Sequence, residues 1–117
     1  MMEFYGYSKC STCRKAKALL NSRGINYKDI DITENPPSQA LLKSILKAGD
    51  YELKQLFNTS GQLYRELGMK DKMAQLTEAA AIKLLAAHGK LIKRPIITTG
   101  KQHVVGFDET KIKRLLG

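Results

Sequence analysis

The sequence predicts an α/β fold: a four-stranded mixed sheet with helices on its faces and a helical insertion between a β-α-β half and a β-β-α half. Three observations predict it. Two β-forming runs flank a segment of helical periodicity near the N-terminus, only helical patterns occupy the middle of the chain, and two β-branched runs precede a closing helix. The 117 residues suffice for one domain with its own core. We expect a single domain over residues 1–117, with the insertion at about residues 38–89.

The first half is predicted to form a strand, a helix and a second strand. Residues 4–7 are mostly aromatic and favour a strand that stops in the loop before Cys10. From Ser11 onward, Cys13, Ala16 and Leu20 recur at helical spacing, and Gly24 is placed to end that helix. Residues 25–32 favour a second strand, which a proline-containing turn ends. A right-handed crossover makes the two strands parallel.

The middle of the chain is predicted to be helical. Ser38 is a plausible N-cap for a helix that ends at Gly49, and shorter helical patterns follow at residues 53–57 and 63–67. Thr77 caps a further helix that we expect to end at Gly89, through the C-terminal role that glycine often has.

The last third is predicted to form a hairpin and a helix. Residues 96–99 are β-branched, residues 100–102 favour a turn, and residues 103–107 form a second strand-like run. Asp108 then caps a closing helix in which Ile112, Leu115 and Leu116 share a face. The whole order of elements is the plan of a thioredoxin-like fold.

The composition excludes several classes of protein. The longest apolar stretch, residues 79–82, is far shorter than the roughly 20 residues that cross a bilayer, so we expect no membrane association. The N-terminus lacks a basic segment, an apolar segment and a cleavage site of the secretory kind, so we expect a cytoplasmic protein.

The charge is strongly basic, with twenty Lys and Arg against eleven Asp and Glu and a formal net charge of +9. The basic residues are spread along the chain and no nucleic-acid-binding motif accompanies them. A solvated cationic surface is favoured over a nucleic-acid-binding face, and we expect no direct sequence-specific contact with nucleic acid. We also expect a monomer, because the predicted helices cover most faces.

The two cysteines carry the clearest chemical signal. Cys10 and Cys13 lie at i and i+3 across the first turn of the first predicted helix, so their thiols can reach each other. A thiolate at a helix N-terminus is stabilised by the unpaired amides there, which makes Cys10 the expected nucleophile. Lys9, Arg14 and Lys15 add positive charge nearby in sequence. Cys13 is the expected resolving thiol.

Two alternatives stay open for this pair. The cysteines could be inert core residues, or they could form half of a zinc site. His88 and His103 lack the spacing of a zinc site and no second cysteine pair exists, so we expect no bound metal or cofactor and favour redox chemistry. Pro95, taken alone, favours a trans proline at the start of an edge strand.

Four segments in this order make the chain similar to the ArsC/Spx family over nearly its full length. This family comprises arsenate reductases that use glutathione and glutaredoxin, and Spx-type regulators that bind the RNA polymerase α subunit. The four segments are Cys-Ser-Thr-Cys-Arg-Lys-Ala at 10–16, Glu-Asn-Pro-Pro-Ser at 34–38, Tyr-Arg-Glu-Leu-Gly at 64–68 and Leu-Ile-Lys-Arg-Pro-Ile-Ile at 91–97.

The resemblance implies a thioredoxin-like fold with a helical insertion and a cis proline at Pro95. It implies that Cys10 is the reactive cysteine and that Arg94, before the proline, binds an oxyanion. At the places of two further arginines of the reductases this chain has Asn58 and Gly106, which weakens arsenate as a substrate.

Residues next to Cys10, Cys13 and Arg94 in sequence are expected to line the substrate-binding site: Lys9, Ser11, Thr12, Arg14 and Pro95.

Two functions follow as hypotheses. The first is a thiol-disulfide oxidoreductase of the arsenate reductase-like family, in which Cys10, Cys13 and Arg94 reduce an oxyanion or disulfide. Glutathione with glutaredoxin, or thioredoxin, would regenerate the dithiol. The alternative is an Spx-type redox-sensing regulator that binds the RNA polymerase α subunit. Whether the protein is an enzyme stays open at this point.

Overall fold

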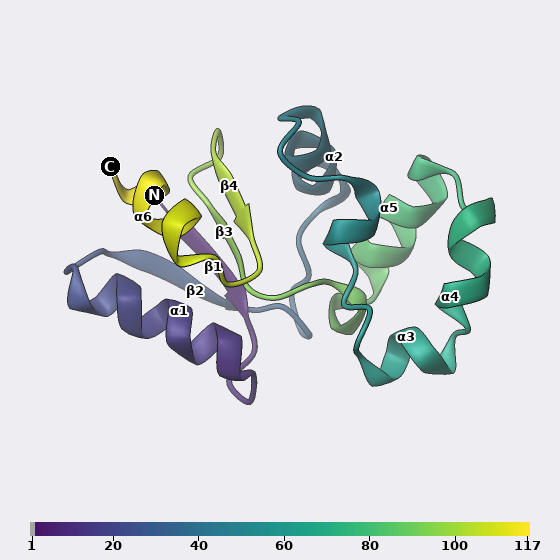
Figure 1. Ribbon diagram of the computed structural model, residues 1–117, viewed down its shortest axis with the longest axis horizontal. Coiled ribbons are helices and arrows are strands. Elements are labelled where there is room, and N and C mark those ends of the chain that lie inside the picture. Colours follow the sequence, from purple (N-terminus) through teal and green to yellow (C-terminus); the bar gives the residue numbers. More distant parts are fainter. Residues whose placement is uncertain (1) are drawn as a thin grey trace.

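The computed structural model describes residues 2–117, and the fold is α/β and thioredoxin-like, as the sequence predicts (Figure 1). The strands and α-helices are β1 (Met2–Gly6), α1 (Ser11–Ser22), β2 (Tyr27–Asp31), α2 (Gln39–Lys47), α3 (Gln62–Glu66), α4 (Met69–Lys72), α5 (Glu78–Ala87), β3 (Ile96–Thr98), β4 (His103–Val105) and α6 (Glu109–Leu116). Three short 3-10 helices complete the set: η1 (Leu53–Leu56), η2 (Met73–Gln75) and η3 (Gly89–Leu91).

The four strands form one mixed sheet in the order β2-β1-β3-β4. β1 pairs with β2 in parallel, which confirms the predicted crossover, and β3 is antiparallel to both β1 and β4. The hairpin therefore places Ile96 beside Tyr5 near the end of β1, from which the chain leads to Cys10 and α1.

Alternate side chains of each strand point to two separate apolar clusters. Phe4 and Ile97 contribute to a cluster beneath α1 and α6, which also contains Cys13. Tyr5 and Ile96 point the other way, into a larger cluster built with the inserted helices. Figure 1 shows α1 and α6 on one side of the sheet and α2 to α5 gathered on the other.

Three predicted N-caps are confirmed by their hydrogen bonds. Ser38 Oγ accepts from the Leu41 amide at 3.1 Å. Thr77 Oγ1 and Asp108 Oδ1 make the equivalent bonds at the start of α5 and α6. Each cap satisfies one of the amides that the first turn of a helix leaves unpaired.

The insertion differs from the prediction in two places. The short helix α4 was not predicted, because it follows Gly68 directly and carries only a single turn of weakly patterned residues. Gly89 does not end α5 through a left-handed conformation. The helix ends at Ala87 with His88 as its C-cap, and Gly89 is buried where a Cβ atom would collide with the backbone carbonyl of Ile32.

Because two backbones meet at Gly89, we expect Gly89→Ala to destabilise the fold. Overpacking at rigid backbone costs about 1 to 3 kcal/mol or more, and a carbonyl group cannot rotate aside as a flexible side chain could. Urea denaturation would measure the loss. The exposed neighbour provides the control: Lys90→Ala should change the free energy of unfolding by less than about 0.5 kcal/mol. Equal stability of the two variants would contradict the contact with Ile32.

The hairpin is shorter than predicted. β4 ends at Val105 because Gly106 adopts a left-handed conformation with φ 80°, which turns the chain toward α6. Among the helices of residues 2–117, none has the length and apolar character that crossing a membrane requires.

Candidate functional site

Cys10 occupies the N-cap position of α1, as predicted. Its backbone is extended, with φ −91° and ψ 122°, and its amide donates to the Tyr7 carbonyl at 3.1 Å. Its side chain makes no capping hydrogen bond and is half-buried. The sulfur therefore lies at the positive end of the helix, where the first-turn amides favour a negative charge.

Cys13 lies one turn further along α1 and is only 1% exposed. It packs in the same apolar cluster as Phe4, Ala16 and Ile97. Both cysteines are free thiols. The predicted arrangement of an accessible thiol followed by a buried one is confirmed.

The Thr12 hydroxyl connects Cys10 to a segment 82 residues away. Thr12 Oγ1 lies 3.0 Å from Cys10 Sγ and 3.3 Å from the carbonyl oxygen of Arg94, to which it donates. A hydroxyl carries one hydrogen, so it can accept from a thiol while donating to the carbonyl, or donate to a thiolate instead. Thr12 therefore offers a hydrogen bond to either protonation state of Cys10.

Arg94 is the cation of the site. Its side chain is half-buried, and the guanidinium carbon lies 5.4 Å from the centre of the Tyr7 ring. The Arg94–Pro95 peptide bond is cis, as the family resemblance implies, and Pro95 is buried. This arrangement brings a guanidinium, which is always protonated, to the loop that carries Cys10.

The pKa of Cys10 is lowered to about 7. Burial acts in the opposite direction, but hydrogen bonds from the Thr12 hydroxyl and from the thiol and backbone of Cys13 outweigh it, and the charge of Arg94 adds to them. About half of the Cys10 side chains are therefore thiolate at neutral pH.

The pKa of Cys13 moves the other way, to about 12. Burial is the main cause, and the hydrogen bond with Cys10 and repulsion by the Cys10 charge reinforce it against the opposing effects of the Tyr7 backbone and Arg94. One turn of helix thus separates a thiol that ionises easily from a thiol that stays protonated. The two cysteines therefore differ in how easily they ionise.

The other expected substrate-lining residues lie less centrally. Lys9, Ser11 and Arg14 are exposed, and the cation that acts on the Cys10 pKa is Arg94. Proximity in sequence therefore overstated the influence of Lys9 and Arg14. Thr12 adjoins the Cys10 sulfur and Pro95 adjoins Arg94, and both remain candidates for substrate contact.

The places of the two further reductase arginines carry no positive charge. Asn58 is half-buried, and its backbone N–H donates to the Leu91 carbonyl at 2.7 Å. A Cβ atom on Gly106 would lie 2.8 Å from Cε of Lys93, because the Lys93 chain already covers that glycine. Arg94 is the one cation of the three family positions that this chain supplies.

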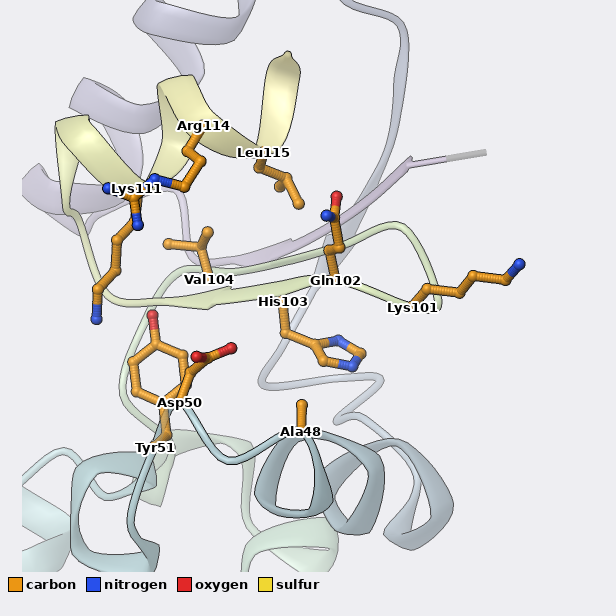
Figure 2. A pocket seen from close by; sticks show the side chains of 10 residues that line it. All are labelled: Ala48, Asp50, Tyr51, Lys101, Gln102, His103, Val104, Lys111, Arg114 and Leu115. Carbon is orange, nitrogen blue, oxygen red and sulfur yellow. The ribbon is translucent and has the colours of Figure 1, made fainter.

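Sequence reasoning missed a second feature, a cavity of about 330 Å³ between α6, the β3–β4 hairpin and the segment after α2 (Figure 2). Cys10, Cys13 and Arg94 do not line it. His103 is half-buried in its wall. Within residues 2–117, no three His, Cys, Asp or Glu side chains come together in a way that could hold a metal ion.

The position of the Thr12 hydroxyl leads to a testable expectation. Thr12→Val keeps the shape of the side chain and removes its hydrogen bond to the thiolate, so the pKa of Cys10 should rise by about one unit. The pH dependence of iodoacetamide alkylation would measure it. Thr12→Ser, which keeps the hydroxyl, should retain the pKa of the unmodified protein. An unchanged pKa in Thr12→Val would contradict this role.

Comparison with known proteins places this arrangement among related chains. The model of the ArsC family matches residues 5–115. An uncharacterized protein of Bacillus subtilis, YusI, is 45% identical over 112 residues, which cover 96% of this chain and 95% of that protein. The global transcriptional regulator Spx 2 of Bacillus anthracis is 29% identical over 116 residues, covering 99% of this chain and 87% of the regulator.

Solved structures agree with this placement. A protein of Streptococcus mutans UA159 described as a possible arsenate reductase is 47% identical, with a TM-score of 0.91 over 100% of this chain and 98% of that one. An ArsC family related protein of Bacteroides fragilis is 38% identical, with a TM-score of 0.92 over 97% of this chain and 96% of that one.

Proposed function

The chain belongs to the ArsC family, and from that premise we propose that it is a thiol-disulfide oxidoreductase with Cys10 as the nucleophile and Cys13 as the resolving thiol. The observation that carries the proposal is the contrast between the two thiols, whose pKa values are about 7 and about 12 within one turn of α1. The attacking cysteine must be a thiolate at the working pH, whereas the resolving cysteine can stay protonated until the mixed disulfide has formed.

The reaction proceeds in two exchanges. The Cys10 thiolate attacks one sulfur of a substrate disulfide, so that a bond from Cys10 to this sulfur forms, the substrate S–S bond breaks, and the other substrate sulfur leaves as a thiolate that takes up a proton. Cys13 then loses its proton and attacks Cys10, which releases the second substrate thiol and leaves a Cys10–Cys13 disulfide. Two electrons pass from the protein dithiol to the substrate.

The first exchange also changes the surroundings of Cys13. Once the Cys10 sulfur is covalently bonded, its negative charge is gone, and with it one of the causes that raise the pKa of Cys13. Arg94 remains beside the pair and favours the Cys13 thiolate. The second exchange is therefore assisted only after the first has taken place.

Disulfides fit this site better than arsenate does. An oxyanion with several negative oxygens needs several charge-assisted donors, each worth about 1.5 to 3 kcal/mol. Arg94 supplies one, while Asn58 and Gly106 supply none of the others that the family resemblance implies. A disulfide needs no such set of charges, because the attacking thiolate and a leaving thiol suffice.

A separate dithiol must regenerate the protein after each turnover. Thioredoxin, or glutaredoxin with glutathione, is the class of reductant that the Cys10–Cys13 disulfide would take, since each reduces disulfides by the same exchange. We place this cycle in the cytoplasm, where such reductants keep thiols reduced.

The direct test is turnover of a small disulfide. Reduced protein would be incubated with hydroxyethyl disulfide or, in a parallel arm, arsenate, together with NADPH and either the thioredoxin or the glutathione–glutaredoxin system. We expect NADPH consumption with the disulfide that depends on this protein. Absence of protein-dependent consumption with the disulfide under both reductants, whether or not arsenate is consumed, would contradict the proposal.

The relatives favour testing a second function. Curated relatives include global transcriptional regulators named Spx, which are 29% identical over 116 residues. If this chain is a regulator of that kind, oxidation of Cys10 and Cys13 would alter a surface that binds the α subunit of RNA polymerase. Binding to the carboxy-terminal domain of that polymerase subunit would be measured with the protein reduced and oxidised. A redox-dependent change that Cys13→Ser removes would favour the regulator, and absence of binding in both states would exclude it.

A further inference from the structure

The cavity between α6 and the hairpin is lined by cations that have no carboxylate partner. Lys111 and Arg114 project from α6 one turn apart, and Lys101 lies at the hairpin turn (Figure 2). The two ion pairs found in residues 2–117 involve Lys17 and Lys113, so neither neutralises the cavity. Asp50 is the one carboxylate on its wall.

The position of Lys111 is fixed by an aromatic ring. Lys111 Nζ lies 4.6 Å from the centre of the Tyr51 ring, a cation–π distance. Tyr51 is itself buried and anchored, because its hydroxyl accepts a hydrogen bond from the Val105 amide at 3.0 Å. A cation held in place before a ligand arrives loses less conformational entropy on binding than a free lysine does.

The open edge of the sheet adds a backbone donor. β4 is an edge strand, and the Gly106 amide donates to the Pro95 carbonyl at 2.8 Å on the β3 side. Because antiparallel pairing alternates along a strand, His103 and Val105 turn their amides outward. The backbone amide of Val105 donates to the Tyr51 hydroxyl, while the backbone amide of His103 lies at the cavity wall.

The His103 side chain completes the polar wall in a neutral form. Its Nδ1 lies 2.8 Å from the buried Thr98 hydroxyl, which already accepts from the Gly100 amide at 3.0 Å. This hydrogen bond fixes the orientation of the imidazole ring in the wall of the cavity. Burial lowers the pKa of His103 against the opposing charge of Asp50, which agrees with a neutral ring.

We propose that this cavity binds a small dianion, a phosphate ester or a dicarboxylate, through Lys111, Arg114 and the backbone amide of His103. Two cations one turn apart match two negative charges, and the volume of about 330 Å³ is at the lower end of the range for small-molecule sites. Val104, Leu115 and the Tyr51 ring provide apolar surface for the uncharged part of such a ligand. A small molecule is favoured over an acidic polypeptide because Lys111 and Arg114 both line a single hollow of about 330 Å³.

The test uses defined probes on the full chain. Adenosine monophosphate, pyrophosphate and succinate would be titrated in separate arms at physiological ionic strength, with amide chemical shifts and calorimetry as readouts. We expect at least one probe to bind, with shifts at His103 and along α6, and its identity distinguishes a phosphate from a carboxylate ligand. Lys111→Gln and Arg114→Gln should each weaken binding about tenfold.

Lys113→Gln is the matched control, because it removes the same charge from the same helix at an exposed residue that pairs with Glu109. It should leave the affinity unchanged, and all three variants should keep the thiol reactivity of Cys10. Two results would overturn the proposal. One is equal weakening of binding by Lys113→Gln, and the other is that no probe binds at about 10 mM. Binding of poly-glutamate alone, without any small dianion, would overturn it as well.

Discussion

Replacement of Cys10 by serine should reduce disulfide turnover by roughly a thousandfold or more, since a serine hydroxyl cannot replace the thiolate at neutral pH. The reason is local: the sulfur at the N-cap of α1 ionises with a pKa of about 7, whereas a hydroxyl in the same place stays protonated. NADPH consumption coupled to thioredoxin or glutaredoxin would measure the loss.

Cys13→Ser should behave differently from Cys10→Ser. Its nucleophile is intact, so the first exchange takes place, but the mixed disulfide cannot be resolved within the protein. We expect turnover to fall with thioredoxin and to recover in part when added glutathione resolves the intermediate from outside. Equal retention of activity in both variants would contradict the assigned roles.

The second large effect is the pH dependence of the two thiols. Because the pKa of Cys10 is lowered, the thiolate is present above about pH 7 and is lost as the pH falls through that value. Alkylation by iodoacetamide should therefore reach half of its maximal rate near pH 7 and fall steeply below that pH, by up to about tenfold for each pH unit. Cys13, whose pKa is raised to about 12, should stay unmodified across this range.

Arg94→Gln provides the matched variant for the pH experiment. This substitution removes the charge of Arg94, which lowers the Cys10 pKa, so the midpoint of the alkylation curve should move to higher pH. The shift should be smaller than in Thr12→Val, because the effect of the charge on the pKa is smaller than that of the Thr12 hydrogen bond. Arg14→Gln removes the same charge from an exposed residue on α1 and should leave the midpoint unchanged. A midpoint near pH 8.5 in the unmodified protein would contradict the described surroundings of Cys10.

Local sequence patterns were sufficient to predict the centre of the site. The N-cap position of Cys10 and the burial of Cys13 follow from the strand, the loop and the helical spacing, which involve neighbours in sequence. Arg94 is far away in the chain, and only the resemblance to a known family pointed to it, whereas its position beside Tyr7 is visible in the structure alone. The helix caps were equally predictable, because a cap depends on residues three positions apart.

Other features depend on contacts that no local pattern encodes. Gly89 is required because the backbone of Ile32 passes against it, 57 positions earlier in the chain by their residue numbers. Lys111 and Tyr51 meet only because α6 and the insertion lie on either side of β4. The basic residues are spread along the sequence, so their pattern did not predict that the fold brings Lys101, Lys111 and Arg114 to one cavity.

The order of attack by the two thiols is the central claim, and the most direct measurement of it is the mass of a trapped mixed disulfide. Reduced Cys13→Ser and Cys10→Ser would each be exposed to one equivalent of hydroxyethyl disulfide at pH 7, quenched with acid and analysed by peptide mass spectrometry. We predict a mercaptoethanol adduct on Cys10 in the first variant and an unmodified Cys13 in the second. An adduct on Cys13 that forms as fast as the adduct on Cys10 would contradict the assignment of nucleophile and resolving thiol.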